Sequence, residues 1–187
     1  NFLTECATDY RKNLNTNIIG ITGSCGKTTL KELLGKGLAK ITKTYFSPKS
    51  FNNKFGVPLS LLNLKQNMNF GVFEVGMDKK GEIDYLSKIL KPNLGIITNI
   101  SYAHSKNFEN IKGIANAKSE LINNITINGS VILNKDDQFY NFLKNESKKK
   151  NLSIYAFSLN KNNKCYATFY KILKTNNGYK IFFKIGS

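Results

Sequence analysis

The stretch Asn17–Thr29, NIIGITGSCGKTT, passes from an apolar run through a glycine-containing turn into the start of a helix. Residues 17–22 are apolar enough to predict a buried strand, and residues 28–40 carry leucines at helical spacing on one face. A buried strand that leads through a turn into a helix is the repeating unit of a parallel α/β sheet. This stretch therefore decides the fold class that we expect.

The turn inside this stretch is typical of a phosphate-binding loop. Gly23 and Gly26 let the backbone approach a phosphate, which the loop N–H groups and the helix N-terminus would bind. Lys27 would neutralise phosphate oxygens, and the Thr28 hydroxyl would complete a Mg²⁺ shell. The general pattern has a glycine five residues before Gly26, where this chain has Ile21, so the loop is a shorter variant. The alternative is an ordinary strand–helix turn, which GKTT in this setting disfavours.

Outward from the loop, short apolar runs alternate with helical periods. This alternation predicts an α/β fold similar to P-loop NTPases, with a mostly parallel sheet flanked by helices. The further strands that we expect are residues 44–46, 70–75, 94–99, 130–134 and 152–157. The further helices that we expect are residues 58–64, 81–90, 110–123 and 136–149.

The C-terminal part of the chain has a different pattern. Residues 165–173 and 178–185 are aromatic and β-branched, and the turn signal Asn176-Asn177-Gly178 separates them. They predict an antiparallel hairpin at the edge of the sheet. We therefore expect one domain in three parts: a lead-in helix over residues 1–16, an α/β core over residues 17–158 and a hairpin over residues 164–185.

The charge of the chain raises the question of nucleic-acid binding. The 187 residues include 28 Lys and Arg against 12 Asp and Glu, which gives a net charge of +16. Arg11 is the only arginine, whereas nucleic-acid readers usually rely on the guanidinium group. Abundant Lys, Asn and Ile together are typical of AT-rich codons. We expect no nucleic-acid partner, and a basic nucleic-acid-binding P-loop module remains an alternative.

Composition also bears on the compartment. No apolar run is long enough to span a membrane, and the first residues lack the apolar core of a secretory signal. Three widely spaced cysteines, Cys6, Cys25 and Cys165, predict neither a disulfide framework nor a zinc site. We expect a cytoplasmic protein with no membrane insertion.

Three polar residues lie at the carboxyl ends of expected strands: Glu74 after FGVF, Asn99 after GIIT, and His104 in the loop that follows. In doubly wound sheets, ligands gather outside the carboxyl ends of the strands. A carboxylate beside a phosphate loop typically holds Mg²⁺, directly or through water, so Glu74 is a candidate metal ligand. A surface acid is the alternative for Glu74. His104 is the only histidine, and a lone histidine is more often a packed or surface residue than a ligand.

Six motifs follow one another along the chain: ITGSCGKTTLKE (21–32), NNKFGVPLSLL (52–62), EVGMDKKGEI (74–83), PNLGIITNISYAH (92–104), IANAKSE (114–120) and LNKDD (133–137). Together they resemble the Mur ligases, a family of ATP-dependent amide-bond-forming enzymes of peptidoglycan assembly. The resemblance extends from about residue 17 to residue 137. Gly76-Met77 follows Glu74, where the branch that adds the third peptide residue usually has Ser-Ser-His. The motifs are most similar to the branch that adds D-alanyl-D-alanine.

The resemblance implies a role for each matching residue. Thr28 and Glu74 would hold one Mg²⁺, and His104 would serve a second. Lys118, 14 residues after His104, stands where the family often carries a carbamylated lysine, which would also hold the second metal. An unmodified lysine on the helix surface is the alternative. The implied catalytic residues are Lys27, His104 and Lys118. The implied ATP-binding residues are Gly23, Ser24, Cys25, Gly26, Lys27, Thr28, Thr29, Asn53 and Asn99.

The implied reaction is the ligation of D-alanyl-D-alanine to UDP-N-acetylmuramoyl-tripeptide. ATP would phosphorylate the peptide carboxylate, and the amine would attack the resulting acyl phosphate. The resemblance implies a three-domain enzyme, with a substrate domain before this region and a further domain after it. We expect that a chain of 187 residues has no room for either. We therefore expect a monomeric fragment, the central ATP-binding domain, with weak Mg·ATP binding and little or no ligation. Another Mur-like amide ligase, such as a folylpolyglutamate synthase, is an alternative.

Overall fold

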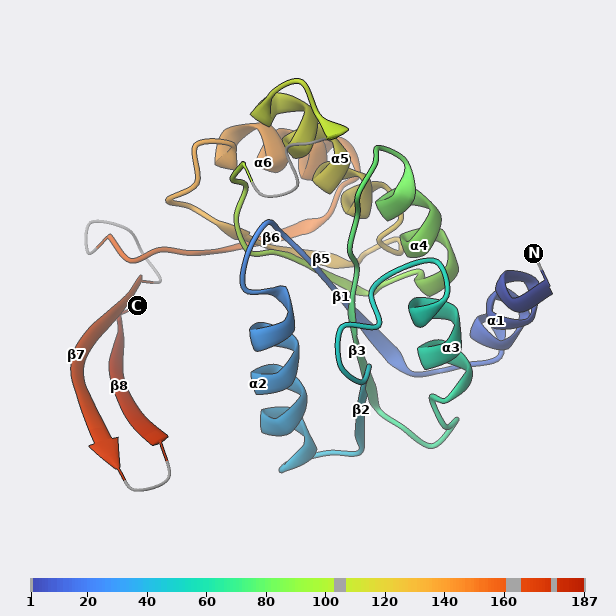
Figure 1. The fold of residues 1–187 in the computed structure, drawn as a ribbon, viewed down its shortest axis with the longest axis horizontal. Helices are drawn as coiled ribbons and strands as arrows, with labels where there is room; N and C mark the ends of the chain where they lie inside the picture. Colours follow the sequence, from blue (N-terminus) through green and yellow to red (C-terminus); the bar gives the residue numbers. More distant parts are fainter. Residues whose placement is uncertain (1, 103–106, 161–165, 176–177, 187) are drawn as a thin grey trace.

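A six-stranded sheet forms the centre of the computed structural model, which describes residues 2–102, 107–160, 166–175 and 178–186. All of its strand pairs are parallel, in the order β2-β3-β1-β4-β5-β6 (Figure 1). The predicted parallel α/β sheet is confirmed. The strands are β1 Asn17–Thr22, β2 Thr44–Phe46, β3 Phe70–Glu74, β4 Leu94–Ile97, β5 Ser130–Asn134 and β6 Ser153–Phe157.

Helices cover both faces of this sheet. Figure 1 shows α2 on one side, and α4 and α5 on the other. None of the helices in the described part of the chain combines the length and apolar character that crossing a membrane requires. The helices are α1 Phe2–Lys12, α2 Lys27–Ala39, α3 Gly56–Leu62, α4 Glu82–Leu90, α5 Ile111–Asn123 and α6 Tyr140–Lys149.

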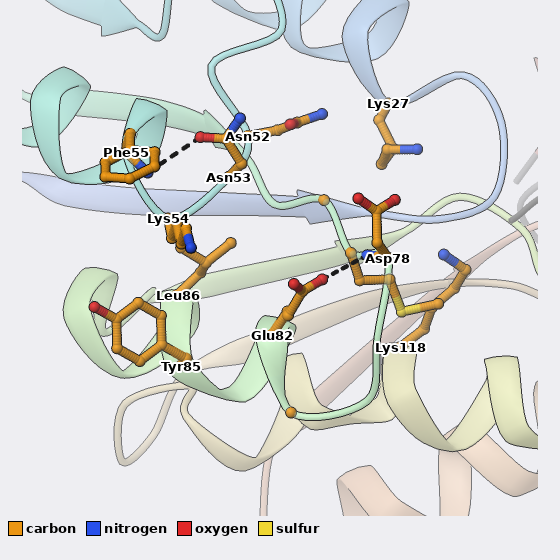
Figure 2. A pocket seen from close by; sticks show the side chains of 13 residues that line it. Lys27, Asn52, Asn53, Lys54, Phe55, Asp78, Glu82, Tyr85, Leu86 and Lys118 are labelled. Carbon is orange, nitrogen blue, oxygen red and sulfur yellow. Dashed lines mark hydrogen bonds between the residues drawn. The ribbon is translucent and has the colours of Figure 1, made fainter. Parts of the chain in front are cut away.

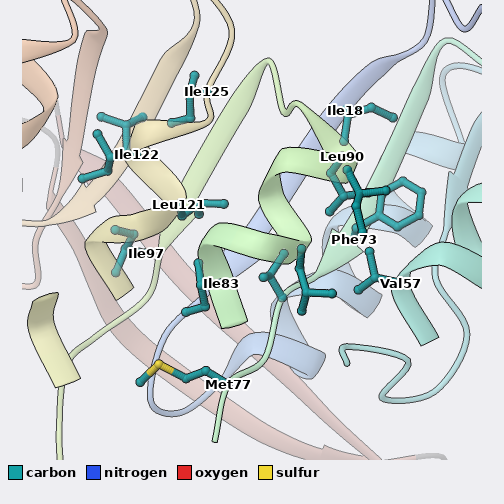
Figure 3. Close-up of a cluster of buried hydrophobic side chains, with 14 of the residues drawn as sticks. Ile18, Val57, Phe73, Met77, Ile83, Leu90, Ile97, Leu121, Ile122 and Ile125 are labelled. Atoms are coloured by element: carbon teal, nitrogen blue, oxygen red, sulfur yellow. The ribbon is translucent and has the colours of Figure 1, made fainter. Parts of the chain in front are cut away.

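The sheet separates two clusters of buried apolar side chains, because successive side chains of a strand point to opposite faces. The smaller cluster includes Ile19 and Ile21 of β1, against which the leucines of α2 pack. The larger cluster includes Ile18 of β1 and Phe73 of β3, together with side chains of the helices on the other face (Figure 3). Strand β1 is therefore covered on both faces, as its apolar run predicts.

The turn after β1 lies at the point where the strand order reverses. The chain builds β2 and β3 on one side of β1, and then β4, β5 and β6 on the other. Ile21 pairs with Glu74 of β3, and Thr22 pairs with Ile97 of β4. The segments that follow β1, β3 and β4 therefore meet at one edge, which is where ligands of open α/β sheets bind.

Two helices begin elsewhere than predicted, because side chains bind the backbone before them. Helix α6 begins at Tyr140 rather than at residue 136. Asp137 accepts hydrogen bonds from the N–H groups of Ile100 (2.7 Å) and Phe139 (2.9 Å), which forms a turn in place of a helical start. Helix α3 begins at Gly56 rather than at Pro58, because Asn53 Oδ1 accepts from the Gly56 N–H (2.9 Å).

The C-terminal strands lie in a different place from the one predicted. β7 (Tyr166–Thr175) pairs antiparallel with β8 (Gly178–Gly186). The expectation that they extend the edge of the main sheet is wrong, because they form a two-stranded sheet of their own (Figure 1). At the end of β6, Asp136 accepts hydrogen bonds from the Ser158 hydroxyl and the Leu159 N–H, and the chain turns there.

Candidate functional site

The turn between β1 and α2 has the backbone geometry of an anion-binding loop. Gly26, the residue that caps α2, has φ 81°, and Gly23 has φ 148°. A Cβ atom at Gly23 would also collide with the Thr98 hydroxyl, whereas Gly26 has open space around it and is favoured by its positive φ alone. Since Gly26 has no side chain to cap α2, the N–H groups of the first helical turn are left for an anion.

The segment after β4 holds this loop in place. Asn99 Oδ1 accepts a hydrogen bond from the Cys25 N–H (3.0 Å), while the Thr98 hydroxyl donates to the Cys25 carbonyl (2.7 Å). The Ser24 hydroxyl donates to the Ser101 carbonyl (3.0 Å) and accepts from the Ser101 N–H (2.9 Å). The side chains of Asn99 and Ser24 therefore fix the shape of the loop.

Lys27 lies over the same loop. Its ammonium donates to the carbonyls of Gly23 (2.9 Å) and Ser24 (3.3 Å). The positive charge is thus held beside the backbone that would surround a phosphate. Thr29, in the first turn of α2, is exposed. The structure brings together all the loop residues singled out from the sequence, from Gly23 to Thr29.

Beside the loop, a buried carboxylate joins three elements. Glu74, the last residue of β3, is 1% exposed. One carboxylate oxygen accepts from the Thr28 hydroxyl (2.6 Å), and the other accepts from the Asn52 amide (2.8 Å). The surface-acid alternative for Glu74 is therefore wrong. Carboxylate and hydroxyl oxygens beside a phosphate loop are donors that suit Mg²⁺, which takes few protein ligands and keeps water or phosphate for the rest.

Asn52 is a site residue that the sequence reasoning did not single out. Besides its bond to Glu74, its carbonyl accepts from the Gly76 N–H (2.8 Å). A Cβ atom at Gly76 would lie 2.9 Å from Asn52 Cγ, so the glycine provides the room that this asparagine needs. The sequence motif contains both Asn52 and Asn53, but the family resemblance implied a role for Asn53 alone.

A pocket of about 680 Å³ opens beside the loop (Figure 2). Asn53 lines it and is held at the start of α3, since its Oδ1 accepts from the N–H groups of Phe55 and Gly56. Gly81 also lines the pocket, and its N–H donates to Glu120 of α5 (2.9 Å), which ties α5 to the start of α4. The lining residues are Lys27, Asn52, Asn53, Lys54, Phe55, Gly76, Met77, Asp78, Gly81, Glu82, Tyr85, Leu86 and Lys118.

Lys118 extends from α5 into this pocket (Figure 2). It is 1% exposed, so the alternative that placed this lysine on the helix surface is wrong. Within the described residues, its ammonium has no hydrogen-bond or ion-pair partner. Burial, and secondarily the charge of Lys27, lower its pKa from 10.5 to about 7, against an opposing effect of Cys25. A lysine with this pKa is substantially a neutral amine at neutral pH.

His104 falls in residues 103–106, outside the described residues. Among the residues that the structure does describe, no three His, Cys, Asp or Glu side chains gather into a group that could hold a metal ion. Of the residues expected to hold metal ions, Thr28, Glu74 and Lys118 lie within the described part of the chain.

Arg11 has a structural role. Its guanidinium donates to the carbonyls of Leu90 (2.6 Å), Lys91 (3.1 Å) and Leu14 (3.0 Å), which ties α1 to the end of α4. Burial lowers the pKa of this guanidinium from its ordinary value. The only guanidinium in the sequence is therefore engaged in hydrogen bonds inside the fold.

The fold and the loop define a class: a parallel α/β domain with a phosphate-binding loop at the switch point of its sheet. Residues 21–187 match the family described as the Mur ligase middle domain. The chain belongs to the Mur ligase family.

Particular relatives are close in sequence and structure. The chain is 39% identical over 168 residues to the UDP-N-acetylmuramoyl-tripeptide–D-alanyl-D-alanine ligase of Buchnera aphidicola from Acyrthosiphon pisum, which covers 90% of this chain and 36% of that protein. A crystal structure of MurF from Acinetobacter baumannii superposes with a TM-score of 0.85 at 32% identity, over 99% of this chain and 42% of that one. MurF from Thermotoga maritima in complex with ADP gives a TM-score of 0.81 at 25% identity, over 97% and 41%.

The matches differ in how much of each relative they cover and in their sequence identity. The chain spans about 36% of the length of the Buchnera ligase that it matches. A folylpolyglutamate synthase from Mycobacterium tuberculosis shares the fold with a TM-score of 0.73, over 97% of this chain and 50% of that one. Its identity is 13%, so this second likeness concerns the fold alone.

Proposed function

We propose that this chain holds the Mg·ATP site of a ligase that joins D-alanyl-D-alanine to UDP-N-acetylmuramoyl-tripeptide. The observation that carries the proposal is the contact between Thr28 and Glu74 beside Lys27, at the mouth of a phosphate loop. The similarity to a ligase with those substrates, at 39% identity over nine tenths of the chain, supports the choice of reaction. The Thermotoga relative with bound ADP supports the choice of nucleotide.

In this proposal, the loop residues Gly23 to Thr29 bind the ATP phosphates. Their backbone N–H groups and the N-terminus of α2 bind oxygens, and Lys27 neutralises charge on the terminal phosphates. Asn99 contributes through the loop, because its side chain holds Cys25. Asn53, on the pocket wall, would lie near the reacting groups.

Thr28 and Glu74 would hold Mg²⁺, whose charge would stabilise the phosphate oxygens during transfer. Their side chains already lie 2.6 Å apart. Because Glu74 is buried and ordered by Asn52, its carboxylate would be oriented before nucleotide binds. This arrangement favours in-line transfer of the phosphoryl group to a carboxylate in the pocket, which gives an acyl phosphate that an amine can attack.

Lys118 would serve the second metal after carbamylation, together with His104. The neutral amine attacks CO₂, forms one N–C bond and releases one proton, which leaves a carbamate anion. A lowered pKa favours this reaction, since the unprotonated amine is the reactive form. The carbamate would replace a positive charge with oxygen donors of the kind that Mg²⁺ prefers.

A binding experiment tests the nucleotide site. Titration of the 187-residue chain with a fluorescent ATP analogue should show saturable binding that Mg²⁺ strengthens. Lys27→Ala should weaken it about 100-fold or more, because the loop loses its charge on the phosphates. Lys36→Ala is the matched control on the same helix, since Lys36 is exposed. Equal affinity in Lys27→Ala and the native chain would refute the assignment.

A second experiment tests the substrates, in the protein that carries this domain. Phosphate release from ATP should require both UDP-N-acetylmuramoyl-tripeptide and D-alanyl-D-alanine. Release that depends instead on a folate and glutamate would favour a folylpolyglutamate synthase type of ligase. Retention of the chain on DNA at near-physiological salt would favour the nucleic-acid alternative.

A further inference from the structure

Lys31 is a fully buried lysine that the proposed chemistry does not use. It lies on α2, four residues after Lys27 and three after Thr28, so it occupies the same face of the helix. Its side chain is 0% exposed. The ammonium donates a hydrogen bond to the Lys49 carbonyl and lies 3.1 Å from Glu32 Oε1. A buried lysine is unfavourable unless it is paired, so these partners explain how the charge is accommodated.

The Lys49 carbonyl belongs to the segment between β2 and α3, residues 47–53. Lys49 has φ 47°, an uncommon conformation for a residue with a side chain. The segment begins at Ser47, whose N–H donates to the Val72 carbonyl (2.9 Å). It ends in the asparagine pair, where Asn52 binds both Glu74 and Gly76. The bond from Lys31 attaches the middle of this segment to α2.

We propose that Lys31 is a positioning residue for the metal-binding pair. By binding the Lys49 carbonyl, it fixes residues 47–53 relative to α2, which keeps Asn52 on Glu74 and Glu74 opposite Thr28. The proposal rests on the proposed Mg·ATP site for its consequence. The geometric link itself, from Lys31 through Lys49 and Asn52 to Glu74, does not depend on the nucleotide.

To reach the Lys49 carbonyl, residue 31 needs a long side chain that ends in a hydrogen-bond donor. An apolar residue of similar length would fill the space but would leave the Lys49 carbonyl without its donor. Lys36, five residues on along the same helix, is the natural comparison: it also pairs with Glu32, at 3.4 Å, but its side chain is 68% exposed. Lys31→Met and Lys36→Met therefore remove the same charge and an ion pair to the same acid, and only the first removes the attachment of the segment.

The first measurement needs no nucleotide. Amide hydrogen exchange should be faster in Lys31→Met at Gly76 and Asn52, because their N–H bonds depend on the placement of the segment. Exchange at Cys25, which Asn99 holds from the β4 side, should match the native chain. Lys36→Met should be native at all three amides. Native exchange at Gly76 and Asn52 in Lys31→Met would overturn the proposal.

The second measurement compares the affinity for the fluorescent ATP analogue with and without Mg²⁺. Lys31→Met should weaken the Mg²⁺-dependent affinity about tenfold, the effect expected when support for a metal ligand is lost, while the metal-free affinity stays native. Lys31→Arg, which retains a long donor, should restore most of the loss. A parallel fall in both affinities would overturn the proposal in favour of a purely structural role.

Asn52→Ala keeps the test valid if Lys31→Met does not fold, because it removes the far end of the same link. It should reproduce the loss of Mg²⁺-dependent affinity, and a native Mg²⁺-dependent affinity in this variant would overturn the proposal. The two proposals fail in different ways. Absence of nucleotide binding in the native chain would refute the Mg·ATP site, whereas the hydrogen-exchange result would still decide the role of Lys31.

Discussion

Helices α2 and α5 each bury one lysine close to the phosphate loop, and the two side chains are held in opposite ways. Lys31 of α2 has the Lys49 carbonyl and the Glu32 carboxylate as partners. Lys118 of α5 is equally buried, but within the described residues its ammonium has no partner. Burial lowers the pKa of Lys118 to about 7. The same residue type, removed from water to the same degree, is thus a structural cation in one helix and a potential reactive amine in the other.

The difference follows from what each environment offers a positive charge. Desolvation disfavours the charged form of any lysine, and only hydrogen bonds or an opposite charge can offset it. The segment after β2 supplies a carbonyl to Lys31, whereas Lys118 faces a pocket and the charge of Lys27. A buried lysine that faces a pocket without a partner is therefore the stronger indication of chemistry.

The largest effect that we expect comes from removing the partnered lysine. Lys31→Met should lower the free energy of unfolding by about 3 kcal/mol, because a buried carbonyl loses a charged donor. Lys36→Met, which removes an exposed ion pair, should change it by less than about 0.5 kcal/mol. Urea denaturation followed by circular dichroism measures both. A Lys31→Met chain as stable as the native one would erase the distinction between the two lysines.

The next effect has the opposite sign. Lys118→Met should raise the free energy of unfolding at pH 7 by about 2 kcal/mol, because a methionine fills the same space without a desolvated amine. It should also abolish uptake of ¹³C-labelled CO₂ as a carbamate, observed by NMR. Loss of stability in Lys118→Met would mean that the amine has a stabilising partner, and the comparison with Lys31 would then fail.

The difference in unfolding free energy between Lys118→Met and the native chain should depend on pH, because the pKa of Lys118 is lowered in the folded chain. The pKa of Lys118 is lower in the folded chain, so between about pH 7 and 10.5 the unfolded state binds more protons than the folded state. Native stability should therefore rise with pH in this range. The gap between Lys118→Met and the native chain should be constant below pH 7 and should narrow by about 1 kcal/mol from pH 7 to 8.

Urea titrations of both proteins at pH 6, 7, 8 and 9 measure this gap. Groups other than Lys118 titrate in both proteins and cancel in the difference. A gap that stays constant from pH 6 to 9 would show that Lys118 retains an ordinary pKa in the folded state.

The sequence was sufficient to predict the parallel sheet, the phosphate loop and the carboxylate at the end of β3. These depend on local patterns: apolar runs with their turns, GKTT between a strand and a helix, and an acid after FGVF. Lys118 was identified only through the family resemblance. Its burial arises from the packing of α5 against α4, β1 and β4, which no local pattern encodes.

The residues that sequence reasoning missed are those whose roles depend on contacts between distant segments. Asn52 reaches Glu74 only because β2 and β3 are neighbours, and Asp137 reaches Ile100 only because β4 and β5 are. Lys31 carried a usable signal, since its spacing from Lys27 and Thr28 places it on the phosphate side of the helix. In a chain with 28 Lys and Arg, that spacing alone did not distinguish it.

The smallest effect that we expect comes from removing the Glu32 carboxylate, one of the two partners of Lys31, while the Lys49 carbonyl remains. Glu32 is a third exposed, and its pKa is lowered chiefly by its hydrogen bond from Lys31. Glu32→Gln should therefore destabilise the chain slightly at pH 7, far less than Lys31→Met, because the bond to the Lys49 carbonyl remains. The lowered pKa means that this contribution is present at neutral pH and is lost as the pH falls below the usual value of 4.5.

Urea titrations of the native chain and Glu32→Gln at pH 7 and 3 should show a small difference in unfolding free energy at pH 7 that narrows at pH 3, below the usual pKa of 4.5. Hydrogen exchange at Gly76 should stay native. If Glu32→Gln were instead as destabilising as Lys31→Met and loosened Gly76, the carboxylate would hold the lysine in place. The attachment of residues 47–53 to α2 would then depend on an ion pair rather than on the backbone carbonyl.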